Sequence, residues 1–178
     1  LRRIIELEAI EANISDLSGL EHCTQLVQLD LSGNNISDIE PLSRLVNLET
    51  LDLSNNFITD ISPLSGLTKL KFLELNELHI DDIEALSSLH DLETLSLSEN
   101  FFTDVSPLTG LTELKKLNLI DNKITDVAPL AELTKLKKLN LGVNQITNLM
   151  PLAGLTKLEK LGLGSNEITD VTPLAGLT

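Results

Sequence analysis

The chain has 178 residues, of which 42% are hydrophobic and only 2% aromatic, and its formal net charge is −14. This acidic balance argues against nucleic acid and anionic membrane surfaces as main partners. The single cysteine, Cys23, excludes an intrachain disulfide, and no apolar run approaches the roughly 18 residues of a membrane-spanning helix.

One apolar pattern recurs along the whole chain at intervals of 22 residues. Besides the first position, positions four, six, eleven, fourteen, seventeen and twenty of each unit are almost always Leu, Ile or Val. Agreement in seven columns predicts a single domain over residues 1–178, with eight units counted from residue 4 and the last one residue short. The first column consists of Ile4, Leu26, Leu48, Leu70, Leu92, Leu114, Leu136 and Leu158.

In chain order, each unit opens with an alternating x-L-x-L-x segment, which predicts a short, half-buried strand. In the second unit, Leu29 and Leu31 should point inward, while Gln28, Asp30 and Ser32 point outward. Such a strand has no partner within its own unit. It must pair with the same strand of the next unit, which predicts a parallel sheet with a spacing of about 4.8 Å.

A turn and a short return segment follow each predicted strand. Position nine is usually Asn, positions twelve and thirteen are usually Ser or Thr followed by Asp, and all six prolines occupy position sixteen. Proline lacks an N–H group and fixes φ, so it suits the first turn of a short helix or 3₁₀ segment. The preceding Ser/Thr-Asp pair can accept hydrogen bonds from the free N–H groups of that turn.

The consensus L-x-x-L-x-L-x-x-N-x-I-[ST]-D-[IV]-x-P-L-x-x-L-x-x resembles the 22-residue leucine-rich repeat, and its Pro-Leu step and I-[ST]-D-[IV] turn resemble the bacterial internalin type. The resemblance implies an α/β solenoid. Its right-handed superhelix would carry a curved parallel sheet on the concave face and short 3₁₀ or irregular segments on the convex face. It also implies an inward ladder of asparagines that bond to the backbone between repeats, here Asn34, Asn56, Asn100, Asn122, Asn144 and Asn166.

Three residues depart from this pattern. Ala12 and Leu78 replace the ladder Asn, and Ala85 replaces the Pro. Because Leu78 and Ala85 fall in the same central repeat, both the ladder and the turn are in question there.

Catalytic or metal chemistry needs converging polar groups, and the sequence offers few. The three histidines occupy different repeat positions and should face different ways, and Cys23 fills a core leucine position. We therefore expect no enzyme activity, no metal and no cofactor. Stacked carboxylates leave calcium as an alternative to turn capping, which we favour, at Asp16, Asp38, Asp60, Asp82, Asp104, Asp126 and Asp170.

The outward strand positions should be acidic toward the N-terminus and basic toward the C-terminus, where Lys116, Lys138 and Lys160 stack in one column. One interpretation is a surface that steers a polarised partner. The other is a solvated face on which Glu113 and Glu159 balance the lysines.

The sequence also predicts an exposed aromatic patch near the central repeat. It comprises Phe57, Phe72, His79 and Phe101, together with Glu74. Clustered exposed aromatics are typical of a binding hot spot, although single exposed apolar residues are common.

We therefore predict a scaffold that binds a protein partner on its concave face. The internalin resemblance favours a secreted or cell-surface bacterial protein. Two alternatives remain: a cytosolic regulatory subunit that holds an enzyme, similar to the leucine-rich-repeat subunit of protein phosphatase 1, and a structural spacer for another domain. Since Leu1-Arg2-Arg3 is too short to cap the core, we expect flanking caps or domains in the parent protein, or ends that pack on another chain.

Overall fold

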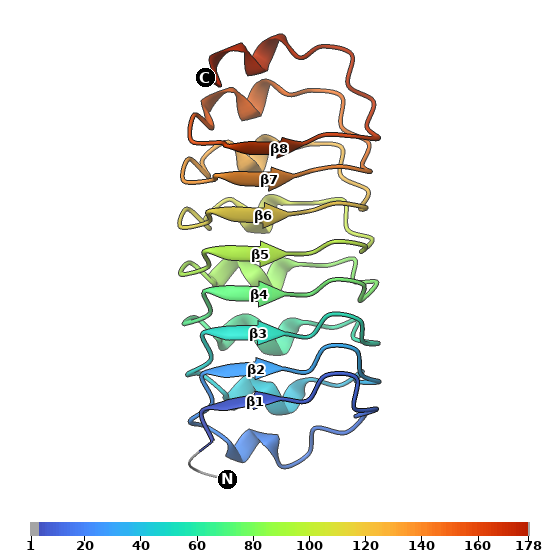
Figure 1. The fold of residues 1–178 in the computed structure, drawn as a ribbon, viewed down its shortest axis with the longest axis vertical. Helices are drawn as coiled ribbons and strands as arrows, with labels where there is room; N and C mark the ends of the chain where they lie inside the picture. The colour runs from blue at the N-terminus through green and yellow to red at the C-terminus, as the bar shows by residue number, and fades with distance from the viewer. Residues whose placement is uncertain (1–3, 178) are drawn as a thin grey trace.

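A computed structural model describes residues 4–177, so the predictions on Leu1-Arg2-Arg3 and on the last residue lie outside it. Eight short strands stack in chain order into one parallel sheet (Figure 1), as the alternating segments predicted. The register advances by one repeat per strand, so that Leu7 pairs with Leu29 and Leu29 with Leu51. The strands are β1 (Glu6–Glu8), β2 (Gln28–Asp30), β3 (Thr50–Asp52), β4 (Phe72–Glu74), β5 (Thr94–Ser96), β6 (Lys116–Asn118), β7 (Lys138–Asn140) and β8 (Lys160–Gly162).

Short 3₁₀ turns form the opposite, convex side of the stack, behind the strands in Figure 1. A proline stands at the start of each of them except η1 and η4. The turn of the central repeat persists without it: Ala85 stands in the proline position, and Leu86 N–H donates to Ile83 O at 3.0 Å. The turns are η1 (Leu20–His22), η2 (Glu40–Arg44), η3 (Ser62–Gly66), η4 (Glu84–Ser88), η5 (Ser106–Leu108), η6 (Ala128–Leu130), η7 (Met150–Gly154) and η8 (Thr172–Gly176).

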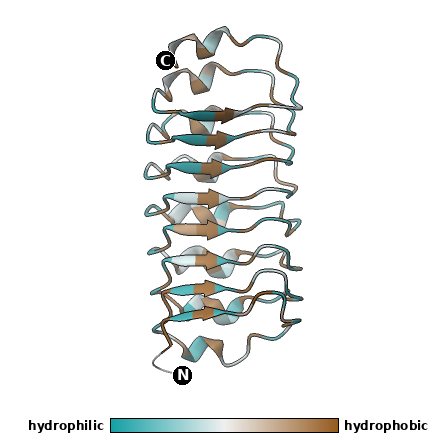
Figure 2. Ribbon diagram, in the orientation of Figure 1, coloured by the Kyte–Doolittle hydropathy of each residue, from teal (hydrophilic) through white to brown (hydrophobic). Residues whose placement is uncertain are grey.

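Between the sheet and the turns runs one aliphatic core, built from the inward columns of every repeat. Figure 2 shows apolar and polar residues alternating within most strands, as expected for a sheet with one buried face. Cys23 packs in a leucine position and is buried, and Phe102 replaces an isoleucine and is only 1% exposed. Among residues 4–177, no helix is long and apolar enough to cross a membrane.

Asparagine side chains bridge consecutive repeats where the chain leaves the strand. Asn56, for example, donates its amide to Leu31 O at 3.0 Å and Leu53 O at 2.9 Å, while its carbonyl accepts from Ile36 N–H at 2.9 Å. Each such side chain supplies partners to backbone groups that water cannot reach. The same type of bridge is made by Asn34, Asn100, Asn144 and Asn166.

Two departures interrupt this ladder, on either side of Asn100. In the fourth repeat Leu78 is 1% exposed and offers the backbone no polar group. In the sixth repeat Asn122 still donates to Leu97 O and Leu119 O, but its buried Oδ1 has no hydrogen-bond partner among the described residues. The preceding repeat contains Phe102 at the position that is isoleucine in the other repeats.

Candidate functional site

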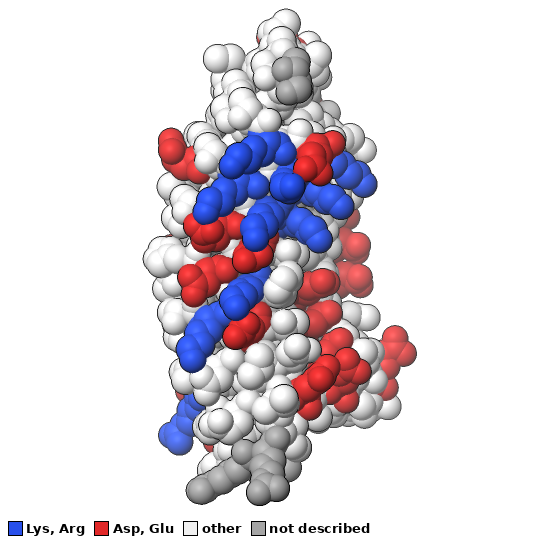
Figure 3. Space-filling view, turned by 60° about the vertical axis from the view of Figure 1, so that its left-hand side comes forward, with Lys and Arg blue, Asp and Glu red and all other residues white. Residues whose placement is uncertain are grey.

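Outward side chains of the strands form two charged columns on the sheet face. The acidic column consists of Glu8, Asp30, Asp52 and Glu74, which follow one another in register at the ends of β1 to β4. The lysine column consists of Lys116, Lys138 and Lys160, which pair in register at the starts of β6 to β8. Figure 3 shows the lysines gathered toward the C-terminal half and a separate acidic group toward the N-terminal half.

A third column, immediately before the strands, is neutralised by ion pairs between neighbouring repeats. Lys71 Nζ lies 2.7 Å from Glu49 Oε2, and Lys115 Nζ lies 2.6 Å from Glu93 Oε2. Lys137 Nζ lies 3.2 Å from Glu159 Oε1. We call these six residues the paired column; its exposed pairs contribute little to stability but cancel their own charge.

The acids expected to balance the lysine column are occupied elsewhere. Glu113 pairs with Lys135 at 2.6 Å, and Glu159 pairs with Lys137 of the paired column. Within residues 4–177, no ion pair involves a member of the lysine column. Three stacked ammonium groups therefore face solvent without a counter-charge.

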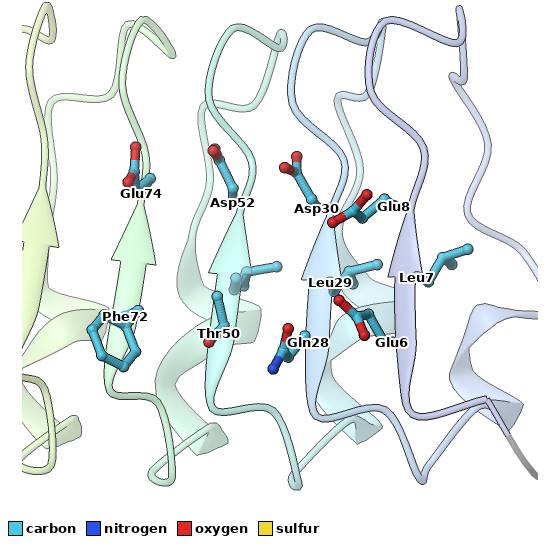
Figure 4. A pocket seen from close by; sticks show the side chains of 11 residues that line it. Glu6, Leu7, Glu8, Gln28, Leu29, Asp30, Thr50, Asp52, Phe72 and Glu74 are labelled. Atoms are coloured by element: carbon cyan, nitrogen blue, oxygen red, sulfur yellow. The ribbon is translucent and has the colours of Figure 1, made fainter.

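The acidic column lines a shallow hollow of about 230 Å³ on the sheet face. Figure 4 shows its carboxylates in a row at the arrowhead ends of the strands, with Phe72 in a second row at the strand starts. Asp30 accepts from the N–H and hydroxyl of Ser32 at 3.0 and 2.7 Å, and Asp52 accepts from Ser54 N–H at 2.8 Å. These neutral donors hold the carboxylates in place without compensating their charge.

Glu74 lies at the centre of the face, where it borders both this hollow and a larger one of about 550 Å³ that the lysine column lines. Partial burial raises the pKa of its carboxyl group above the ordinary value, and the charges of Asp52 and Asp30 raise this pKa further. The side-chain amide of Asn76 donates to Glu74 at 3.3 Å and opposes the shift.

The structure divides the predicted aromatic patch into two places. Phe72 opens β4 and lies on the sheet face, lining the acidic hollow. Phe57, His79 and Phe101 lie in the turns after β3, β4 and β5, seven residues further along the repeat than Phe72. We call these turns the rim. The predicted patch is therefore one central aromatic on the sheet and a separate group on the rim.

The rim group is partly satisfied within the molecule. His79 stacks on Phe101 with ring centroids 5.1 Å apart, and Lys123 Nζ lies 4.7 Å from the centroid of the Phe101 ring. Phe57 is the most exposed aromatic, at 64%. Sequence reasoning missed Lys123, although it follows Phe57, His79 and Phe101 in the same repeat column at intervals of 22.

A separate column of aspartates lies at position thirteen of the repeats, and each accepts a hydrogen bond from the backbone N–H two residues later in the chain. These residues are Asp16, Asp38, Asp60, Asp82, Asp104, Asp126 and Asp170. In the third repeat, for example, Asp60 accepts from Ser62 N–H at 2.8 Å, and this bond, followed by the Ser62 hydroxyl, lowers the pKa of Asp60. Asn148 makes the equivalent contact with Met150 N–H at 2.9 Å, without a carboxylate. This geometry is that of turn capping. In the described part of the chain, no group of three or more His, Cys, Asp or Glu side chains could hold a metal ion.

A known protein family has the same repeat pattern as this chain. A family model described as leucine-rich repeats in two copies matches residues 4–44, 46–88, 90–132 and 134–176. A comparison with curated protein sequences gives no match.

Three solved structures illustrate the similarity of fold. Internalin C2 from Listeria monocytogenes is 37% identical with a TM-score of 0.98, and the match covers 99% of this chain and 78% of that one. Another L. monocytogenes internalin, InlF, is 39% identical with a TM-score of 0.79, covering 99% and 58%. The leucine-rich-repeat ectodomain of a membrane receptor kinase from Arabidopsis thaliana, solved in complex with CASPARIAN STRIP INTEGRITY FACTOR 2, is 29% identical with a TM-score of 0.77, covering 89% and 21%.

Proposed function

This chain belongs to the leucine-rich-repeat family, in its internalin-like form, and on that premise we propose that its concave sheet face binds another protein. Scaffolds of this family mediate protein–protein interactions, and the related plant ectodomain was solved with a ligand bound. In this proposal residues 4–177 act as one recognition domain, with a protein partner, no cofactor and no chemistry of its own.

The observation that carries the proposal is the contrast between the lysine column and the paired column beside it. Every lysine of the paired column has a carboxylate within 3.2 Å, whereas no ion pair among the described residues includes Lys116, Lys138 or Lys160. Like charges at sheet spacing repel one another, so an uncompensated column costs stability in the free protein. A partner that supplies the missing counter-charge removes this cost on binding.

Phe72 and Glu74 occupy the centre of the proposed site, on β4, where the acidic column ends. Phe72 is 44% exposed. A partly exposed aromatic at the centre of a polar surface is the usual composition of an interface anchor. The rim residues Phe57, His79 and Phe101 would then contact the outer edge of the same partner.

Capture from bacterial surface extracts and host-cell extracts tests the proposal, followed by titration of the captured partner. The site variant is Lys116→Ser, Lys138→Ser, Lys160→Ser. Its matched control is Lys69→Ser, Lys135→Ser, Lys157→Ser, which removes the same charge from residues outside the strands. We expect the parent and the control to hold the same partner and the site variant to lose it. A partner bound equally by all three proteins would exclude the sheet face and favour a spacer role or another surface.

A further inference from the structure

We infer that the sheet face recognises a partner segment with two charge blocks of opposite sign, a basic block over the acidic column and an acidic block over the lysine column, separated by an apolar residue over Phe72. This inference rests on the proposed function and specifies the chemistry of the partner. It predicts that the arrangement of charge in the partner, and not its amount, determines affinity.

The charges on the sheet face are segregated along the stack. Outward carboxylates occupy β1 to β4, outward ammonium groups occupy β6 to β8, and β5 between them presents only Thr94 and Ser96. Across the described residues, no ion pair joins a member of the acidic column to any cation. The N-terminal end of the face therefore lacks positive counter-charges, and the C-terminal end lacks negative ones.

The two hollows on this face meet at the centre. Glu74 borders both of them, and Phe72 lines the acidic one. A partner segment can thus contact both columns along one continuous path. Burial, and after it the charges of Asp52 and Asp30, raises the pKa of Glu74, as expected for neighbouring carboxylates with no cation paired to them among the described residues.

The spacing of the strands fixes the length of the partner segment. The centre of the acidic column lies between β2 and β3, and that of the lysine column lies at β7. These centres are four and a half strand intervals apart, or about 22 Å at 4.8 Å per interval. An extended segment spans this distance in about seven residues at 3.3 Å each, and a helix spans it in about fifteen.

Two synthetic peptides of identical composition test the inference. In the block peptide, four Lys are followed by Gly-Leu-Gly and four Glu; its block centres lie seven residues apart, which matches the two columns. In the mixed peptide, Lys and Glu alternate on both sides of Gly-Leu-Gly. We expect fluorescence anisotropy at low salt to give at least about tenfold tighter binding for the block peptide. This advantage should disappear at about 0.5 M salt, where charges are screened.

Charge reversal of the protein provides the decisive comparison. Lys116→Glu, Lys138→Glu, Lys160→Glu should weaken block-peptide binding by at least about tenfold. Adding Asp30→Lys, Asp52→Lys and Glu74→Lys restores the parent net charge and two opposite columns, so binding should recover with the peptide turned end for end. In a control, the exchange Glu49→Lys, Lys71→Glu within the paired column should leave affinity within about twofold, since that pair is already neutral.

Equal affinities for the two peptides, or no recovery in a doubly reversed protein that keeps its circular dichroism spectrum, would overturn the inference. Salt-sensitive dimerisation in sedimentation equilibrium would also overturn it, because the occupant would then be a second copy. The capture experiment separates this failure from that of the proposed function. If the captured partner depends on the lysine column while the two peptides bind equally, the sheet face still binds protein but does not select block charge.

Discussion

Two asparagines of the ladder form a natural matched pair for measuring one buried hydrogen bond. Asn122 and Asn144 occupy the same repeat position and are 7% and 8% exposed. Asn144 Oδ1 accepts from Ile124 N–H at 3.0 Å, whereas Asn122 Oδ1 has no partner within the described chain. We predict that Asn144→Ala destabilises the protein more than Asn122→Ala.

The other contacts of the two side chains cancel in this comparison. Both amides donate to three carbonyls, and each of those carbonyls keeps a second donor after truncation. For Asn122 the remaining donors come from Asn100, Asn144 and Glu99, and for Asn144 they come from Asn122, Asn166 and Asp121. The difference is therefore the Ile124 N–H group, which Asn144→Ala leaves buried without an acceptor.

An unsatisfied buried donor costs about 1–3 kcal/mol, and this is the expected difference between the two variants. At an m-value of about 2 kcal/mol per molar urea, it corresponds to about 0.5–1.5 M in the unfolding midpoint. Circular dichroism is the suitable probe, since the chain contains no Trp or Tyr. Equal midpoints with equal m-values, or a larger loss for Asn122→Ala, would refute the assignment of the ladder energy to this acceptor.

Three further predictions concern single side chains. Val143 has φ of 54°, where β-branched residues are strained, so Val143→Asn, which copies Asn55 at 56°, should raise the free energy of unfolding in urea by about 1 kcal/mol. Burial, and after it the neighbouring carboxylates, raises the pKa of Glu74. The folded state therefore binds the carboxyl proton of Glu74 more tightly than the unfolded state does, and the parent loses stability as pH rises through the raised pKa. In thermal melts, Glu74→Gln should therefore be more stable than the parent at neutral pH and equal to it below about pH 4, under the ordinary glutamate pKa; a constant difference across this range would contradict the cause. Phe102→Ala should cost about 3–5 kcal/mol in urea unfolding because the ring is fully buried, whereas Phe101→Ala, on the half-exposed rim, should cost less than about 1 kcal/mol.

The fold could be predicted from the sequence because each apolar column constrains the same feature eight times. Alternation around Leu29 and Leu31 predicts a strand, and a step of 22 residues leaves the next repeat as its only partner. The left-handed backbone at position eight of the repeat could not be predicted in this way. Glu99, Asp121 and Val143 share it with φ between 54° and 57°, although neither Glu nor Val favours it.

The candidate site was predicted only in outline, because its parts depend on how side chains meet across a repeat. Counting by 22 places Phe72 on a strand and Phe57 just past one, but it does not show that His79 stacks on Phe101 while Phe72 lies apart on the sheet face. The ion pairs posed the same difficulty. The sequence offers Glu159 several nearby lysines, and only side-chain geometry shows that it pairs with Lys137 and leaves the lysine column free.

The regular core also explains why the charged columns are suited to recognition. Buried leucines such as Leu117 and Leu139 fix the strands that carry Lys116 and Lys138, so the protein cannot relieve their repulsion by moving the strands apart. The charges are therefore held in place before any partner arrives, and binding requires little reorganisation of the scaffold. Affinity differences between the block and mixed peptides consequently measure charge placement alone. A change in the circular dichroism signal of the β-sheet on peptide binding would contradict this rigidity.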